Sequence, residues 1–203
     1  GIEAPDSGRV SKAGSVNIGI LSQTDDLSQD SFVRDVVLGD SATHEWAGNS
    51  KVREVLTGLF GGISEELLDR KISYLSGGER RRVNLAKLLI GDFDLVLLDE
   101  PTNHLDVEGV AWLANHLNQR KNLAVLVITH DRWFLDAVTD RTWEVVAGKV
   151  EEYDGGYSAF VLAKAERARQ ANAMDARRNN LIRKELAWLR RGAPARTTKP
   201  KFR

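Results

Sequence analysis

Two adjacent carboxylates, Asp99 and Glu100, follow an uninterrupted apolar run at residues 95–98. Such a run is typical of a parallel strand buried on both faces, and open α/β sheets bind ligands at the carboxyl ends of these strands. Because the pleat sends neighbouring side chains to opposite sides, the two acids can have different tasks. One can hold Mg²⁺ together with phosphate oxygens, and the other can act as a general base toward water. A helix N-cap after the strand is the alternative.

His130 follows a second apolar run, residues 123–128, and is therefore expected at the same sheet edge. A lone histidine is usually structural, but one beside paired acids indicates contact with a phosphate. Ser76, Gly77 and Gly78 precede a helical pattern, where free backbone N–H groups and the helix dipole attract an anion. A purely structural glycine turn is the alternative for this segment.

The surrounding pattern predicts an α/β fold. Between the two apolar runs lies an amphipathic segment, residues 107–117, which gives a β-α-β crossover. Gly148 separates two strand-like segments that read as a hairpin. Further strands and helices are predicted at residues 16–21, 31–38, 51–60, 79–90 and 157–191.

The composition excludes several classes of protein. The 203 residues include no cysteine, which rules out a disulfide scaffold and a thiolate metal site. No apolar run is long enough to cross a membrane, and no secretory signal is visible. The four histidines are scattered, which argues against a zinc enzyme.

Charge divides the chain into an acidic body and a basic tail. Residues 161–203 carry thirteen Lys or Arg against three Asp or Glu, a net charge of +10, and residues 1–160 carry −10. This division is expected where one part does chemistry and the other meets a polyanion. A solvated charged helix is the alternative, and Arg80, Arg81 and Arg82 are expected to form such a solvated face.

The order of the motifs resembles the ATP-binding-cassette superfamily. Gln23 matches its Q-loop, LSGGE at residues 75–79 its signature motif, LLDEPTNHLD at 97–106 its Walker B motif and D-loop, and His130 its switch histidine. The resemblance implies a P-loop NTPase-like α/β domain over residues 1–160, with a helical subdomain at about 31–90. Residues 161–203 would be a basic helical linker with an irregular tail.

The wording DEPTNHLD further resembles the ABC-F family, in which two cassettes share one chain without a membrane domain. YDGGYSAF at residues 153–160 resembles the exit from a first cassette into the linker, and residues 188–192 and 195–199 resemble the Uup-like, mainly actinobacterial branch. The implied partners are a second cassette, the ribosome, rRNA and P-site tRNA. The implied location is cytoplasmic and the implied function is ATP-gated ribosome binding in translation.

The resemblance also implies residue roles in ATP hydrolysis. Asp99 and Gln23 would hold Mg²⁺, and Gln23 would also approach the attacking water. Glu100 would be the general base and His130 would bind the γ-phosphate. Ser76, Gly77 and Gly78 would contact the γ-phosphate of the ATP held by the opposite cassette, and Asp106, also assigned to the nucleotide site, would align across that interface.

The tail supplies candidate RNA contacts, with packing against a second linker helix as the alternative for Trp188. The candidates are Arg183, Lys184, Trp188, Arg190, Arg191, Arg196, Lys199 and Lys201.

No Gly-x-x-x-x-Gly-Lys-Ser/Thr sequence, the loop that cradles ATP phosphates, occurs in the chain. Residues 1–8 resemble the segment that follows this loop, so the chain is expected to begin just downstream of it and to be inactive alone. Two alternatives stay open: the ATPase subunit of a membrane transporter, and a non-catalytic RNA- or partner-binding fragment.

Overall fold

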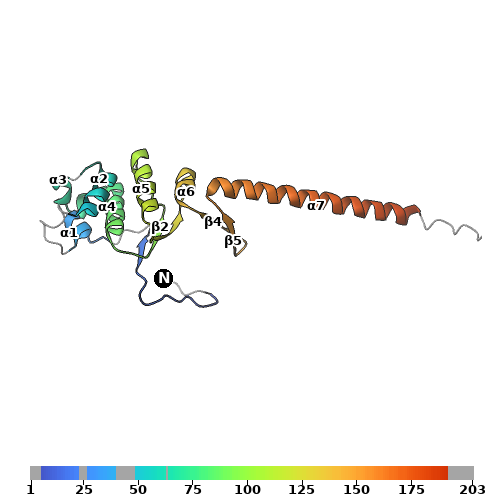
Figure 1. The fold of residues 1–203 in the computed structure, drawn as a ribbon, viewed down its shortest axis with the longest axis horizontal. Helices are drawn as coiled ribbons and strands as arrows, with labels where there is room; N and C mark the ends of the chain where they lie inside the picture. Colours follow the sequence, from blue (N-terminus) through green and yellow to red (C-terminus); the bar gives the residue numbers. More distant parts are fainter. Residues whose placement is uncertain (1–5, 23–26, 40–48, 63, 192–203) are drawn as a thin grey trace, which may run out of the picture. The chain divides into compact units, whose positions relative to one another are not determined.

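The computed structural model describes all residues except 1–5, 23–26, 40–48, 63 and 192–203. Contacts divide the chain into two units, residues 1–140 and 141–203 (Figure 1). The first unit contains β1 (Ile18–Leu21), α1 (Val33–Leu38), α2 (Ser50–Phe60), α3 (Glu65–Leu68), the 3₁₀ turn η2 (Ile72–Tyr74), α4 (Gly77–Ile90), β2 (Leu95–Asp99), α5 (Val107–Gln119), β3 (Ala124–Ile128) and α6 (Arg132–Val138). The predicted boundary at residue 160 stays a prediction.

The strands of the first unit form a parallel sheet in the order β1-β2-β3. Leu21 pairs with Leu98, and Asp99 pairs with Ile128, so the carboxyl ends of the three strands lie at one edge. The α5 crossover between β2 and β3 accounts for the parallel direction, as the sequence pattern predicts.

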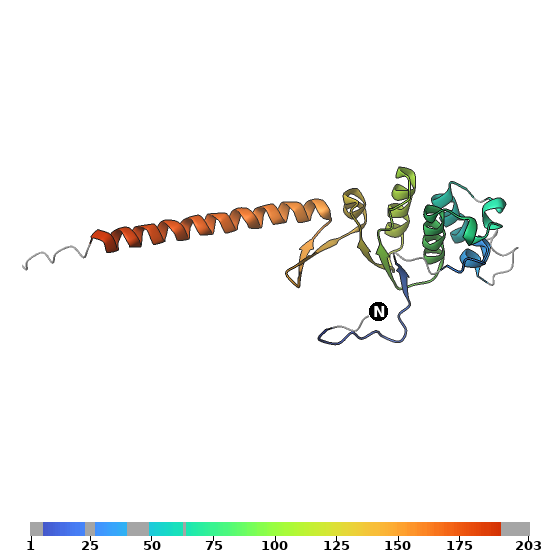
Figure 2. The same ribbon diagram turned by 180° about the vertical axis from the view of Figure 1, so that it is seen from behind.

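The hydrophobic core lies between the sheet and its helices. Alternate residues of the strands are buried, including Leu21, Val96 and Leu98. Helices α4, α5 and α6 stand on the same side of the strands in both views (Figure 2). Burying apolar side chains between these two layers is the main favourable contribution to folding.

One prediction about this sheet is wrong. Like residues 95–98, the uninterrupted apolar run at residues 123–128 predicts a strand buried on both faces, but Ile128 is 64% exposed and Leu126 is 41% exposed. Ile20 of β1 is exposed in the same way. The reason is that the described helices cover one face of the sheet only, so the alternate residues of β3 are left uncovered.

The second unit consists of a hairpin and one long helix. Strands β4 (Arg141–Val146) and β5 (Lys149–Asp154) pair antiparallel, and α7 (Tyr157–Arg191) follows after Gly155 and Gly156. The phenol ring of buried Tyr153 meets Phe160 edge to face, with 5.0 Å between ring centroids. Arg167 lies over Tyr153 and pairs with Glu151 at 3.0 Å, so the first turns of α7 are fixed to the hairpin.

The predicted hairpin and long helix are confirmed. Most of the other predicted strands and helices agree with the structure to within two residues, whereas α3, η2 and α6 were not predicted. α3 and η2 span only four and three residues, too few for hydrophobic periodicity to reveal them. Among the described residues, no helix is both long and apolar enough to cross a membrane.

Candidate functional site

The carboxyl edge of the sheet brings together residues that are far apart in sequence. Asp99 ends β2, Glu100 follows it, and Thr129 and His130 follow β3. The register of β2 and β3 places Asp99 opposite Ile128. The predicted meeting of the acidic pair and His130 at one edge is therefore confirmed.

Glu100 adopts an unusual backbone conformation. Its φ is 47°, in the left-handed region that few residues other than glycine adopt. Its N–H donates to the carbonyl of Ile128 at 2.7 Å, which extends the pairing of β2 and β3 by one residue. The chain then leaves the sheet, and the conformation directs the Glu100 side chain along the strand edge toward Thr129 and His130.

The Glu100 carboxylate is held by hydrogen bonds from the end of β3. Oε2 accepts from the Thr129 hydroxyl at 3.1 Å and from the His130 backbone N–H at 3.3 Å. The side chain of Glu100 is only 13% exposed. A carboxylate restrained in this way is preorganised to accept a proton from a water molecule.

Thr129 is the centre of a small network. Its oxygen accepts from the N–H of Asp131 at 3.2 Å and lies 3.2 Å from the hydroxyl oxygen of Thr102. Because Thr129 gives its one hydroxyl hydrogen to Glu100, Thr102 must be the donor in the second contact. Asp131 in turn caps α6 by accepting from the N–H of Phe134.

The His130 imidazole is fully exposed, at 101% of its reference area. Its Nε2 lies 3.5 Å from Oε1 of Glu100, beyond the usual range of a hydrogen bond. The exposed ring can therefore contact a ligand at the carboxyl edge of the sheet, while the backbone N–H of His130 donates to Glu100.

The LSGGE segment forms a capping box at the start of α4. Ser76 Oγ accepts from the Glu79 N–H at 3.3 Å, and the Glu79 carboxylate accepts from the Ser76 N–H at 2.8 Å. The carboxylate also accepts from the Ser76 hydroxyl at 2.8 Å. These two bonds from Ser76 to the carboxylate, with a contribution from Arg70 at 2.9 Å, lower the pKa of Glu79 to about 2. The carboxylate therefore stays ionised and fixes the turn that Gly77 and Gly78 begin.

The turn at residues 75–79, called the signature turn below, adjoins the loop that follows Glu100. A Cβ atom on Gly78 would lie 3.2 Å from Cβ of His104, whose own φ is 68°. Asp106, two residues further on, caps α5 through a bond of 2.8 Å from the Gly109 N–H. The nucleotide-binding roles assigned to Ser76, Gly77, Gly78 and Asp106 stay predictions.

The magnesium prediction concerns Asp99 and Gln23, and Gln23 lies outside the described residues. Within the described ranges, no three or more His, Asp or Glu side chains gather at a metal-binding distance. Mg²⁺ commonly takes one or two protein carboxylates and fills its other positions with phosphate oxygens and water. Asp99 at a strand end is compatible with that kind of site.

The prediction that residues 80–82 form a solvated face is wrong for Arg81. This side chain is buried, with 9% exposure, and its guanidinium donates to the backbone carbonyls of Ser22 and Asp99. Arg82 lies 5.6 Å from the Phe60 ring centroid. Local sequence contains no sign of this, because the two acceptors lie at the ends of β1 and β2, 59 and 18 residues away.

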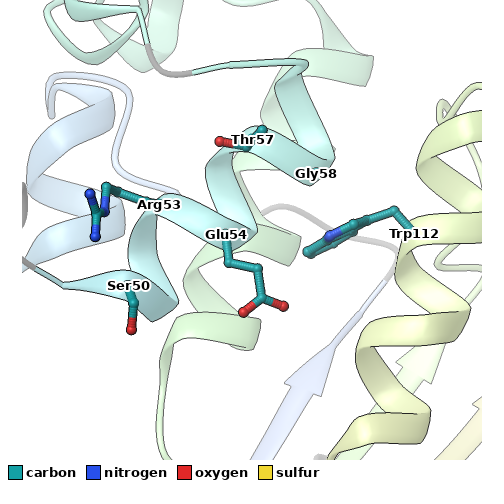
Figure 3. A pocket seen from close by; sticks show the side chains of 6 residues that line it. All are labelled: Ser50, Arg53, Glu54, Thr57, Gly58 and Trp112. Atoms are coloured by element: carbon teal, nitrogen blue, oxygen red, sulfur yellow. The ribbon is translucent and has the colours of Figure 1, made fainter.

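An open hollow of about 460 Å³ lies between α2 and α5, and its lining residues include none of the strand-edge residues described above (Figure 3). Trp112 covers Gly58 and stacks on His116, with 4.8 Å between ring centroids. His116 Nδ1 lies 2.8 Å from Oε1 of Glu54. Burial lowers the pKa of His116, so a neutral ring donates its Nδ1–H to Glu54 at neutral pH.

Four of the predicted RNA-binding residues have described side chains. Arg183, Lys184, Trp188 and Arg190 are all exposed on α7. Arg183 and Arg190 line a hollow of about 360 Å³ on one face of this helix. The Arg191 side chain, Arg196, Lys199 and Lys201 lie outside the described residues.

Sequence reasoning missed the supporting roles of Thr102, Thr129 and Arg81. The two threonines could have been found from the sequence, because Thr129 directly precedes His130 and Thr102 lies two residues after Glu100. Arg81 could not, because Arg on a helix is usually solvated.

A parallel sheet with an acidic pair, a histidine and a capped glycine turn around one edge defines an ATP-binding-cassette type of domain. The ABC transporter family model matches residues 1–103, about half of the chain, so the chain belongs to this family. A second model, also described as ABC transporter, matches residues 143–201.

Two curated relatives illustrate the similarity. The uncharacterized ABC transporter ATP-binding protein YfmR of Bacillus subtilis is 46% identical over 162 residues, covering 80% of this chain and 25% of YfmR. The energy-dependent translational throttle protein EttA of Mycobacterium tuberculosis is 37% identical over 237 residues, covering 100% of this chain and 42% of EttA. The chain thus spans less than half the length of either relative.

Among solved structures, the fold is similar to the archaeal ribosome recycling factor aABCE1, solved in complex with the archaeal ribosomal stalk protein aP1. The TM-score is 0.65 with 27% identity, over 81% of this chain and 32% of aABCE1. The α/β cassette fold ending in a long helix is confirmed.

Proposed function

We propose that this chain is part of an ATP-hydrolysing cassette of an ABC-F protein that binds the ribosome in an ATP-gated manner during translation. The observation that carries the proposal is the restrained Glu100 carboxylate at the sheet edge. The names of EttA and aABCE1, which refer to translation and ribosome recycling, support the choice of the ribosome as partner. A ribosomal role would place the protein in the cytoplasm.

In the proposed reaction, Glu100 takes a proton from the water that attacks the γ-phosphate of ATP. His130 lies beside it with an exposed ring and binds the γ-phosphate. Asp99 and Gln23 would hold a magnesium ion, which would neutralise charge on the phosphate oxygens. Positioning and electrostatic stabilisation supply most of the rate increase in this chemistry.

The phosphate cradle would come from residues outside these 203, because the chain contains no Gly-x-x-x-x-Gly-Lys-Ser/Thr sequence. Four residues of this chain would then face the ATP that is bound to a second cassette: Ser76, Gly77, Gly78 and Asp106. The capping box supports this role, since it fixes the backbone of the turn while nothing lies within 4 Å of the position that a Cβ would take on Gly77.

The basic helix would make the RNA contacts. Arg183 and Arg190 are seven residues apart, two helical turns, and therefore lie on one face of α7. Exposed Trp188 lies between them in sequence and offers a stacking surface. The further basic residues Arg191, Arg196, Lys199 and Lys201 would extend this contact.

The test is co-sedimentation of the natural full-length protein with ribosomes. Glu100→Gln protein is expected to pellet with ribosomes in ATP and to stay in the supernatant in ADP. Double replacement of Arg183 and Arg190 by Gln should weaken binding and reduce its salt dependence, since fewer phosphate contacts release fewer counterions. Replacement of exposed Lys149 and Lys121 by Gln is the charge-matched control.

Binding that ignores the nucleotide would favour the non-catalytic RNA-binding alternative. Absence of ribosome binding, together with recovery in the membrane fraction, would favour the transporter ATPase.

A further inference from the structure

Arg81 connects helix α4 to the ends of two strands. One terminal nitrogen of its guanidinium donates to the carbonyl of Ser22, directly after β1, and the other donates to the carbonyl of Asp99, the last residue of β2. The partners lie 59 and 18 residues away in sequence. A single side chain thus connects the first turns of α4 with the carboxyl edge of the sheet.

The chemistry of arginine suits this position. Its guanidinium stays charged and presents donors on two separate nitrogens in a planar fork. Burying such a group is unfavourable unless its hydrogen bonds are satisfied. Lysine carries its charge on one nitrogen and cannot reproduce the fork.

The Arg81 contacts lie close to two parts of the proposed site, Glu100 and the signature turn. Asp99 is followed by Glu100, whose φ of 47° depends on where the preceding carbonyl is held. Arg81 itself is only five residues after Ser76, so a rigid stretch of helix joins the capped glycine turn to this carbonyl. A shift of the turn would therefore move the end of β2, and a shift of the end of β2 would move the turn.

We infer that Arg81 is a positioning residue that couples the signature turn to the strand end carrying Glu100. It sets the direction of Glu100 through the Asp99 carbonyl and holds the exit of β1, which leads to Gln23. The inference rests on the proposed ATPase function for its kinetic consequence, but the contact itself has a structural consequence that does not.

The kinetic test compares Arg81→Met and Arg81→Lys in the natural full-length protein. We expect Arg81→Met to lower kcat at least tenfold with KM for ATP within twofold of wild type, and Arg81→Lys to recover part of the loss. Lys87→Met removes an equal charge from an exposed position of the same helix and should leave kcat unchanged. Equal kcat for Arg81→Met and Lys87→Met, with an active wild type, would overturn the inference.

Amide hydrogen exchange tests the coupling without ATP turnover. In Arg81→Lys and Arg81→Met, peptides covering residues 95–101 should exchange at least tenfold faster, because the Glu100 N–H loses its fixed geometry toward Ile128. Peptides of α4 beyond residue 83 should keep their protection. Unchanged exchange at 95–101, or loss of protection confined to α4, would overturn the inference. Absence of wild-type turnover would count against the proposed function only, and the exchange result would still decide this coupling.

Discussion

The hydroxyl of Thr129 donates to Oε2 of Glu100 at 3.1 Å, joining the ends of two neighbouring parallel strands. The same carboxylate oxygen accepts the His130 N–H, so the end of β3 determines where the carboxylate of β2 points. The orientation of the proposed base therefore depends on residues nearly thirty positions away.

Replacing Thr129 by Val should lower ATP turnover of the natural full-length protein about tenfold or more. A hydrogen bond to a charged group contributes about 1.5–3 kcal/mol, and about 1.4 kcal/mol corresponds to a factor of ten in rate. Thr129→Ser keeps the hydroxyl and should retain most of the activity. Steady-state phosphate release measures both variants, and equal rates for Val and Ser would argue against orientation by this hydroxyl.

Glu100→Gln should bind ATP with little change in affinity but hydrolyse it about 10²–10⁴-fold more slowly, the usual contribution of a general base. Glutamine keeps the size and the acceptor oxygen that Thr129 contacts, so the fold should be preserved. Single-turnover hydrolysis and equilibrium ATP binding separate the two effects. An unchanged hydrolysis rate would remove Glu100 from the proposed role.

Gly58→Ala should destabilise the first unit, because the added Cβ would lie 2.0 Å from the Trp112 ring. Overpacking costs about 1–3 kcal/mol and alanine in a helix interior gains about 1 kcal/mol, so the net destabilisation should be at most about 2 kcal/mol. The control is Gly14→Ala, in a turn outside the helices, where nothing lies within 4 Å of the new atom. Chemical denaturation of both variants gives the difference, and equal stability would show that Trp112 moves aside freely.

The free energy of unfolding should depend on Glu79 in acid. Hydrogen bonds from the Ser76 backbone and side chain lower the pKa of Glu79 from 4.5 to about 2 in the folded protein. Because the pKa is lower in the folded state, the ionised carboxylate contributes its full stabilisation above pH 4.5. This contribution to the free energy of unfolding is lost as the pH falls toward 2. NMR titration of the Glu79 carboxyl carbon measures the folded-state midpoint directly.

Ser76→Ala is the companion variant for this titration. It removes the side-chain bond and keeps the backbone bond, so the Glu79 midpoint should move up only part of the way. A wild-type midpoint near 4.5 would show that the capping box does not form in solution.

The sequence by itself determined the α/β class, most strands and helices, and the motif order. These features depend on neighbours within a few residues: apolar runs define strands, helical periodicity defines α2, α4 and α5, and an unbroken stretch without Gly or Pro defines α7. The expectation that Glu100 and His130 meet also came from sequence, because parallel strands end at a common edge.

Only the tertiary structure decided which groups hold Glu100, why Arg81 is buried and which face of β3 is uncovered. Each depends on contacts between segments that lie 18 to 59 residues apart or on which side of the sheet carries helices. Local patterns carry hydrophobicity and backbone preference, but the partner of a polar side chain is chosen by packing in three dimensions.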